Sequence, residues 1–558
     1  MNVLLVNPKS PASFWSFEGV LDLLGKKAVN PPLGLLTVAG LLPRSWECRL
    51  IDLTFQSLKQ EDWEFADVVM VTGMYVQSKG IAETIGEAKR RGKFIVLGGA
   101  WAFHNGEEGL RLGADIVVPG EAEAVSSRLV ESIEHGKSGT LLVSERHADM
   151  STSPVPRFDL LEMDAYVDMA VQFSRGCPFK CEFCDVTTML GHKIRSKTPS
   201  QFLAELQELY DRGWRRYVFI VDDNFIAHRG KVKAVLKELA SWQKGRGRPL
   251  SFSTQASVNL AADEELLDLL VLAGFFKVFL GIESTDEESH RLAGKYQNVI
   301  DLDAACRTIN RKGLQIIAGC ILGFDNENAG AGRRLVDFAV RNSIPDVLVN
   351  PLQAMPGTAL SRRLEETGRL LGNAFAGENL SNSYGLMNFI PTRPQRDIIE
   401  ELIELHEELY SPAAYMERSF SHFGNMEALP YRKPFSLPYF FELKAVMTVI
   451  IRQGLLRPSR LIFWRHFLRA LVIFPSHTDK FLASLIVGEH LFEFARTYVE
   501  RLRVQIDEES IRALHSPGEK TILEKAGRGV PEGSPDHLGR QADVAIIDQG
   551  RAGLPPSS

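Results

Sequence analysis

The sequence predicts an α/β protein with three successive parts: an N-terminal open parallel sheet of the Rossmann-like kind, a central partial (β/α)6 barrel and a helical C-terminal region. Short β-branched runs alternate with amphipathic segments over the first two parts, as in parallel α/β folds. Beyond about residue 360 the strand-like runs end, and helical patterns continue to about residue 514. A chain of 558 residues is long enough for about three to four domains.

The composition is that of a soluble globular protein. Apolar residues make up 45% and charged residues 24% of the chain, so it can bury real cores. The 64 Lys and Arg against 70 Asp and Glu give a formal net charge of −6, which argues against nucleic acid as a partner. Six cysteines are too few for a disulfide scaffold, and a reducing compartment, the cytoplasm, fits best. The N-terminus has no basic region or cleavage site, and no stretch of about 18 uncharged apolar residues predicts a membrane-spanning helix.

The first domain is predicted over residues 1–140. It contains five strand-like runs, at 3–6, 50–53, 68–72, 94–97 and 116–118. Ligands of open parallel sheets bind at the loops that follow the strands. Thr72, Gly98, Gly99 and Glu121 stand in such loops and are candidate cofactor-binding residues. None of the loops carries GxGxxG or a P-loop, so nicotinamide, flavin and ATP lose their usual sequence support.

A Ser-, Thr- and Pro-rich linker is predicted over residues 141–160, followed by the barrel over 161–359. The barrel has six strand-like runs, at 171–174, 217–221, 250–254, 278–281, 316–321 and 346–350. In such barrels the chemistry lies on the loops after the strands. The helical domain follows over 360–515, and the Gly-, Pro- and charge-rich stretch 516–558 is predicted to be disordered.

Three cysteines, Cys177, Cys181 and Cys184, have the spacing CxxxCxxC directly after the first predicted barrel strand. Thiolates gathered on one tight loop can bind three irons of a 4Fe–4S cluster. The fourth iron would stay open for a substrate or cofactor, so the spacing predicts chemistry rather than electron storage alone. The alternative is a zinc site with His192 as fourth ligand, but zinc usually pairs two CxxC-type knuckles and the sequence has no second one.

At this loop the sequence resembles the radical S-adenosylmethionine superfamily, whose hallmark is CxxxCxxC with Phe before the last cysteine, here Phe183. The resemblance implies that Cys177, Cys181 and Cys184 bind the cluster and that its unique iron chelates S-adenosylmethionine. In that family one electron cleaves the cofactor to methionine and a 5′-deoxyadenosyl radical. A flavodoxin or ferredoxin is the kind of electron donor that this implies.

The later barrel strands match the family in the same order. The resemblance places the segment 219–225, with Asp222, at the methionine moiety, and the GxIxG-like segment with Gly319 and Gly323 near the adenine. Segment 253–257 and then Glu283 and Ser284 follow the third and fourth strands.

Taken alone, several of these residues have structural interpretations. Asp222 and its neighbour Asp223 could be solvated loop acids, although their place at the end of a barrel strand favours function. Glu283 could be a buried structural acid that needs partners, which a bound ribose or amino group would supply. We interpret the remaining cysteines, Cys48, Cys306 and Cys320, as core residues.

The N-terminal sheet resembles the cobalamin-binding domain that precedes the barrel in one large radical subclass. The cobalamin signature DxHxxG is absent, because Asp52 is followed by Leu53, Thr54 and Phe55, so no lower axial histidine is expected. The domain order and the segment 350–358 resemble a subgroup that includes hopanoid C-2 methylases and bacteriochlorophyll side-chain methylases. The resemblance covers about residues 1–500 and implies cobalamin as a third cofactor.

The resemblance implies a cobalamin-dependent C-methyltransferase acting on an unactivated carbon of a hydrophobic small molecule, most like a hopanoid. The alternative within the subclass is a methylase, cyclase or oxidase acting on a tetrapyrrole. A tRNA methylthiotransferase would need a cysteine trio in the first domain, which holds only Cys48. An iron–sulfur or zinc interaction protein without turnover is the alternative from another class.

The C-terminal helices give the only clue to location. Between residues 445 and 478 there is no Asp or Glu, and five arginines alternate with apolar clusters: Arg452, Arg457, Arg460, Arg465 and Arg469. One interpretation is peripheral contact with the inner, anionic face of a membrane. The other is a helical cap that packs its apolar side on the barrel and leaves the arginines in solvent.

Overall fold

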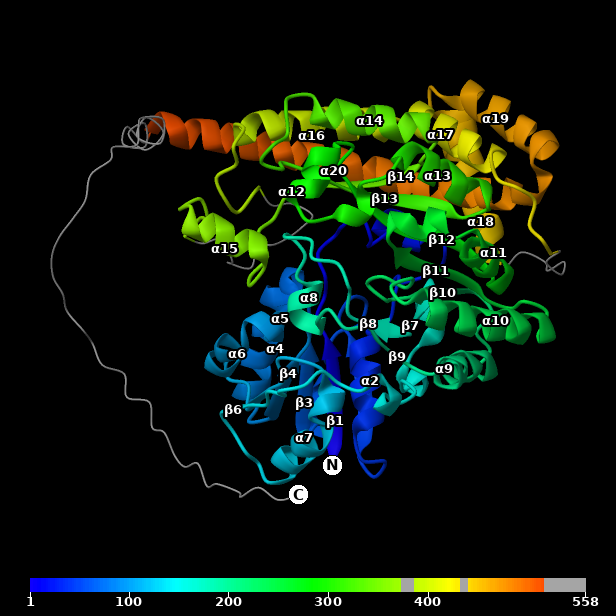
Figure 1. Cartoon of the computed structure of the whole chain (residues 1–558). Coiled ribbons are helices and arrows are strands. Elements are labelled where there is room, and N and C mark those ends of the chain that lie inside the picture. Colours follow the sequence, from blue (N-terminus) through cyan, green and yellow to red (C-terminus); the bar gives the residue numbers. More distant parts are fainter. Residues whose placement is uncertain (373–385, 432–439, 516–558) are drawn as a thin grey trace, which may run out of the picture. The chain divides into compact units, whose positions relative to one another are not determined.

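The computed structural model describes the backbone of residues 1–372, 386–431 and 440–515 (Figure 1). Met1–Ile506 forms one compact unit, and a second unit begins at Asp507, of which the structure describes the backbone as far as His515. The predicted disordered tail, 516–558, lies outside the described residues. The boundaries predicted for the separate domains stay predictions.

The N-terminal sheet has six parallel strands in the order β2-β1-β3-β4-β5-β6. The strands are β1 (Asn2–Asn7), β2 (Glu47–Asp52), β3 (Val68–Thr72), β4 (Phe94–Gly98), β5 (Ile116–Val117) and β6 (Thr140–Leu141). The helices that connect them are α1 (Glu18–Leu21), α2 (Leu33–Leu41), α3 (Gln60–Phe65), α4 (Ser78–Arg90), α5 (Ala100–His104), α6 (Gly106–Leu112) and α7 (Ser126–Glu134). The five predicted strands are confirmed. The sixth was not predicted, because two paired residues at a sheet edge leave no periodic pattern in the sequence.

The second sheet also has six parallel strands, in the sequential order β7-β10-β11-β12-β13-β14. They are β7 (Asp168–Val171), β10 (Tyr217–Ile220), β11 (Ser251–Ala256), β12 (Phe275–Glu283), β13 (Gln315–Leu322) and β14 (Asp346–Pro351). The helices between them are α8 (Val186–Leu190), α9 (Pro199–Asp211), α10 (Arg229–Gly245), α11 (Glu264–Ala273), α12 (Glu287–Leu292), α13 (Leu302–Arg311) and α14 (Ala331–Arg341). This order and direction are those of a partial (β/α)6 barrel that stays open between β7 and β14.

The first barrel strand begins and ends earlier than the predicted run 171–174. β7 stops at Val171, and a short antiparallel pair, β8 (Ser174–Arg175) with β9 (Arg195–Ser196), follows it. The ladder ends because the N–H groups of Phe173 and Ser174 donate to the carboxylate of Asp222, both at 2.7 Å. The cysteine loop therefore leaves from a hairpin held by a side chain rather than directly from a barrel strand.

The C-terminal region is helical, as predicted. Its helices are α15 (Ala359–Glu366), α16 (Gln395–Leu409), α17 (Pro412–Gly424), α18 (Phe440–Ile451), a π-helical turn η8 (Arg452–Leu456), α19 (Arg460–Ile473) and α20 (Thr478–His515). No single helix among the described residues is long and apolar enough to cross a membrane. One pair, Arg460–Ile473 with Pro475–Ile506, passes that test together but is bent by 114°.

Candidate active site

The cysteine loop is held in place by its backbone. Gly176 has a φ of +94°, and a Cβ there would lie 2.7 Å from the carbonyl oxygen of Lys193. Glycine is therefore required where the chain turns out of β8. Directly after it, the N–H of Cys177 donates to the carbonyl of Gly191 at 3.2 Å.

The three thiols share one site. Cys177, Cys181 and Cys184 are each partly exposed and unpaired. Burial raises the pKa of all three thiols, and the charge of Asp185, followed by negative charge on the other two thiols, raises the pKa of Cys184 further. Mutual repulsion of this kind disappears when each thiolate binds a metal ion. In the part of the chain that the structure describes, no three His, Cys, Asp or Glu side chains converge as on a single metal ion. A 4Fe–4S cluster needs no such convergence, because each cysteine binds its own iron.

Other elements hold the loop through Glu182. Its N–H donates to the carbonyl of Ala293 at 2.9 Å, and its carbonyl accepts from the N–H of Leu360 at 2.8 Å. Its carboxylate accepts from Nε and Nη2 of Arg363 on α15, at 3.1 and 2.8 Å. The loop is thus held by Ala293, directly after α12, and by Leu360 and Arg363 of α15.

Asp222 lies behind the loop rather than at its open side. Its side chain is fully buried, and its two oxygens accept from Phe173 N–H, Ser174 N–H and the Ser174 hydroxyl at 2.6 to 2.7 Å. Burial raises the pKa of Asp222 to about 7, although the hydrogen bonds oppose the shift. We infer that Asp222 positions the start of the cysteine loop.

Asp223 is the acid of this pair that faces the thiols. Burial first, and then the charge of Asp185 beside Cys184, raise the pKa of Asp223 to about 6. Its negative charge in turn contributes to the raised pKa of Cys177. An acidic group next to the loop suits the positively charged amino group or sulfonium of a bound cofactor.

Glu283 ends β12 in a strained conformation beside the loop. Its φ is +63°, which is costly for a residue with a Cβ, and a register shift separates it from Gly281. Its carboxylate forms an ion pair with Lys295, and both side chains are nearly buried. Burial lowers the pKa of Lys295, but the charges of Glu283 and Cys181 outweigh it and raise the pKa overall. The cysteines thus have a cation close by.

Gln297 gives the thiols a hydrogen bond. Its Nε2 donates to Sγ of Cys181 at 3.5 Å, and its Oε1 is buried with no hydrogen-bond partner in the described structure. Hydrogen bonds to ligating sulfurs are one of the features that set a cluster's reduction potential. Lys295 and Gln297 were not predicted as site residues, because neither belongs to a motif and only the turn after α12 brings them to Cys181.

The other barrel candidates lie along the same strand ends. Ser284 is buried, and its Oγ accepts from the N–H of Asp286 at 3.1 Å. Gly319 pairs in register with Gly281 and packs against the ring of Phe279, where a Cβ would not fit. Gly323 turns the chain after β13 with a φ of +103°. Within the described residues, Gly319 and Gly323 do not contact the cysteine loop through a hydrogen bond or ion pair, so their part in cofactor binding stays a prediction.

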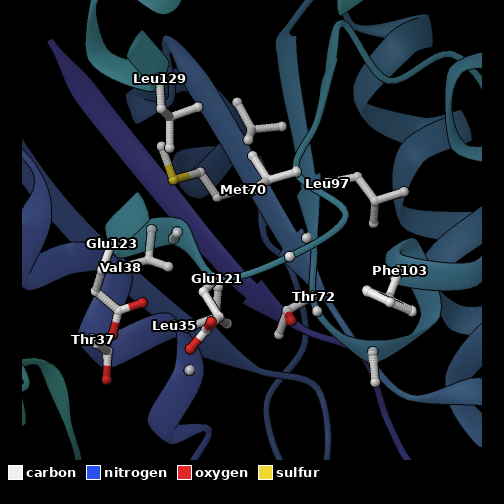
Figure 2. Close-up of a pocket in the computed structure, with 18 of the residues that line it drawn as sticks. Leu35, Thr37, Val38, Met70, Thr72, Leu97, Phe103, Glu121, Glu123 and Leu129 are labelled. Carbon is white, nitrogen blue, oxygen red and sulfur yellow. The ribbon is translucent and has the colours of Figure 1, made fainter. Parts of the chain in front are cut away.

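A cavity of about 370 Å³ lies at the carboxyl edge of the N-terminal sheet (Figure 2). Met70, Leu97 and Leu129 form an apolar part of it, and Glu121, Glu123 and Thr72 lie at the polar side, with Val38 of α2 between the two glutamates. All four candidates from this domain line it: Thr72, Gly98, Gly99 and Glu121. Gln172, Arg175, Met189 and Leu190 complete the lining from beside the cysteine loop. The cavity therefore borders both halves of the compact unit.

Gly99 is required at this rim. Its φ is +88°, and a Cβ would collide with Oγ1 of Thr72 and lie 3.1 to 3.2 Å from the backbone of Gly73. The loops after β3 and β4 are thus closely packed. A side chain at position 99 would push them apart and change the shape of the cavity.

Buried ion pairs join the rim to the cysteine loop. Arg175 donates to Glu121 at 2.9 Å and to Glu123 at 2.8 and 3.0 Å, while Arg195 donates to Glu121 at 2.7 and 2.8 Å. Burial raises the pKa of Glu121 and Glu123, but Arg175 and Arg195 outweigh it at Glu121, and Arg175 with hydrogen bonds from the backbone and Ser153 outweighs it at Glu123, so both pKa values lie below the ordinary one. Glu121 is therefore committed to protein partners. Arg175, two residues before Cys177, was not predicted.

The chain is similar to known proteins over both of its halves. Residues 171–339 match the model of the Radical SAM superfamily, and residues 358–503 match a domain of unknown function, DUF4070. An uncharacterized methyltransferase of Synechocystis sp. is 42% identical over 94% of this chain and 97% of its own. The chain belongs to the radical S-adenosylmethionine superfamily. The hopanoid C-2 methylase of Rhodopseudomonas palustris is 28% identical to this radical enzyme, over 88% of this chain and 93% of its own.

A solved structure has the same fold. The radical S-adenosylmethionine methyltransferase TsrM of Kitasatospora setae, with cobalamin and a [4Fe–4S] cluster bound, superposes with a TM-score of 0.57 at 16% identity. The superposition covers 89% of this chain and 99% of TsrM. This radical enzyme therefore has the two-sheet architecture of that group. Its three thiols, with a cation and an amide donor beside them, fit a 4Fe–4S cluster and the S-adenosylmethionine that such enzymes use.

Proposed function

We propose that this radical enzyme is a cobalamin-dependent C-methyltransferase that methylates an unactivated carbon of a hydrophobic substrate, with a hopanoid as the first candidate. One observation carries the proposal: a single cavity is lined by the rim of the N-terminal sheet and by residues beside the cysteine loop. A cofactor in that cavity would lie next to the radical site. Methylation at an unactivated carbon needs this arrangement, because such a carbon has no lone pair for polar attack on a sulfonium.

In this proposal the residues have distinct tasks. Cys177, Cys181 and Cys184 hold three irons, and Asp223 and Glu283 lie where the charged end of S-adenosylmethionine would bind. Asp222 fixes the loop, and the cavity with Thr72, Gly98 and Gly99 holds part of cobalamin. When bound, the cluster supplies the electron that cleaves S-adenosylmethionine, and cobalamin supplies the methyl group.

The relatives support the proposed substrate. The hopanoid C-2 methylase matches this chain over 93% of its own length, which favours a polycyclic lipid. We also propose a cytoplasmic location and a flavodoxin or ferredoxin as the electron donor, because reducing equivalents must reach the cluster one at a time.

The test is anaerobic reconstitution with iron, sulfide and cobalamin, followed by metal analysis and turnover with methyl-deuterated S-adenosylmethionine. We expect about four irons and one cobalt per chain, and a hopanoid product that carries one additional, deuterated methyl group. Iron without cobalt would overturn the cobalamin part of the proposal. Deoxyadenosine formed without methyl transfer to hopanoid or chlorin substrates would point instead to a cyclase or oxidase. Methylation of a chlorin alone would keep the chemistry and replace the substrate with a tetrapyrrole.

A further inference from the structure

Helices α18 and α19, with the π-helical turn between them, carry an unusual concentration of exposed apolar side chains. Ten of the 24 large apolar side chains that are exposed among the described residues lie between positions 443 and 473. They are Leu443, Met447, Ile451, Leu455, Leu456, Leu461, Leu468, Leu471, Val472 and Ile473. We call this surface the α18–α19 face. Leu461 and Val472 are 77% and 80% exposed, so water covers almost the whole of each side chain.

The opposite side of the same helices is already buried. Ala445, Val449, Phe463 and Ala470 are fully covered, and the ring of His466 of α19 packs against that of Phe420 of α17, tilted by 38° with ring centres 4.5 Å apart. The inner side of α19 therefore packs on the helix α17, and whether the helices cap the barrel stays a prediction. A helix that is apolar all round is normally covered all round, by a core or by lipid. The inner side of these helices is packed on the protein, but the α18–α19 face is exposed to solvent.

The charges around this face are positive. Between Leu443 and Thr478 there is no Asp or Glu. Arg452 and Arg457 share one buried carboxylate, Glu489, at 3.5 and 3.0 Å. Arg465 pairs with Glu417 of α17 at 3.3 Å. Arg460 and Arg469 are exposed and have no ion pair in the described residues, and the guanidinium of Arg469 lies over the ring of Phe420, 4.9 Å from its centre, so the face keeps an excess of positive charge.

This charge pattern distinguishes two partners that could cover the face, a second copy of the protein and a lipid bilayer. In a symmetric dimer the same patch would face itself, and the arginines of one copy would oppose those of the other. An anionic bilayer provides both complements at once: phosphates for the guanidinium groups and an apolar layer for the leucines. Arginines can extend to the phosphates while their stems stay in the apolar layer.

We propose that the α18–α19 face docks the protein on the surface of an anionic phospholipid bilayer. Leu461, Leu468 and Val472 would enter the boundary between headgroups and acyl chains, and Arg460 would bind a phosphate. The inner sides of both helices remain packed on the protein, so the contact is peripheral. This proposal stands on the surface alone and does not depend on the proposed reaction.

The experiment is co-sedimentation of the full-length protein with vesicles of phosphatidylcholine, with and without phosphatidylglycerol, at low and high salt. We expect binding to the phosphatidylglycerol vesicles that weakens with salt. Leu461→Glu with Val472→Glu should lower the partition roughly 100-fold, because two apolar side chains leave the lipid. Arg460→Gln should lower it about fivefold and only on anionic vesicles.

Val340→Glu with Val504→Glu is the matched control, since both valines are exposed apolar residues outside this face. It should bind like the unmodified protein, and far-ultraviolet circular dichroism checks that all variants are folded. Equal binding by the two double variants would overturn the proposal. So would size-exclusion chromatography that shows a dimer dissociated by Leu461→Glu with Val472→Glu while vesicle binding is absent in every form.

Discussion

The two parallel sheets have the same number of strands but differ in strand order, and this difference separates their tasks. In the N-terminal sheet the order reverses at β1, which lies between β2 and β3. Such a reversal leaves a crevice at the carboxyl edge where a ligand can enter between the connections. In the second sheet the strands follow one another from β7 to β14, so each connection runs in the same direction. The ends of β10 and β12 place Asp222 and Glu283 beside the cysteine loop.

The two sheets bring the cavity and the cysteine loop close together in one chain. The cavity of the first sheet and the cysteine loop of the second meet at the carboxyl edges of both, where Arg175 belongs to the loop's hairpin and Glu123 to the rim. A substitution in one sheet can therefore affect its own site and leave the site of the other sheet intact. Three substitutions test whether the two tasks are in fact separate, from the most severe to the least.

The largest effect is expected from removing a cluster ligand. Cys177→Ala, Cys181→Ala or Cys184→Ala should abolish iron–sulfur absorbance and all deoxyadenosine formation, because each thiolate holds one iron. Cobalt binding should remain, since the cavity of the first sheet does not use these residues. Cys306→Ala is the control, because this cysteine is buried in the core away from the loop. Deoxyadenosine formation by any of the three variants would remove that cysteine from the site.

The converse substitution acts on the first sheet. Gly99→Ala should cost about 1 to 3 kcal/mol of stability, since alanine is strained at a φ of +88°, and should displace Thr72. We expect cobalt binding to fall sharply while iron content and absorbance stay unchanged. Gly120→Ala is the matched control: Gly120 lines the same cavity, but a Cβ there meets nothing within 4 Å. If Gly99→Ala lost iron as readily as cobalt, the two sheets would not be independent.

Much of this fold could be predicted from the sequence, because parallel strands are apolar runs that end in glycine-rich loops. Five strands of the first sheet and all six of the second were found in this way. β6 was missed because a two-residue edge strand has no period. The limits of the first barrel strand were wrong because Asp222, far along the chain, takes the N–H groups that would have continued β7.

Some residues of the candidate site could likewise be predicted from the sequence and others could not. The rule that ligands lie at carboxyl ends of strands predicted Thr72, Gly98, Gly99 and Glu121, and all four line one cavity. The partners of those residues could not be predicted in the same way. Arg175 pairs with Glu123 and Lys295 pairs with Glu283. Both carboxylates are distant in the sequence from the cations, so only the folded chain brings the pairs together.

The third substitution, with the smallest expected effect on cofactor binding, acts on the contact between the sheets. Glu123→Gln leaves Arg175 with Glu121 as its remaining carboxylate partner and should cost about 3 kcal/mol, because one member of a buried ion pair is removed. The exposed pair of Glu131 and Lys137 provides the control: Glu131→Gln should cost under about 1 kcal/mol. Urea denaturation at pH 7 measures both. Equal costs would show that the buried pairs do not stabilise the contact.

The same contact predicts a dependence on pH. Arg175 holds the pKa of Glu123 below its ordinary value of 4.5 in the folded protein. The unfolded chain therefore takes up this proton first as the pH falls, so the stabilisation is complete above the ordinary value and is lost progressively below it. Glu123→Gln removes one titrating group from this loss, and its stability should fall less than that of the unmodified protein between pH 5 and about 3. Because these ion pairs join the rim of the cavity to the hairpin of the cysteine loop, acid should weaken the contact between the sheets before either sheet unfolds. In that range we expect deoxyadenosine formation to continue after methyl transfer has stopped. If both activities declined together, the ion pairs would contribute to overall stability without coupling the two sites.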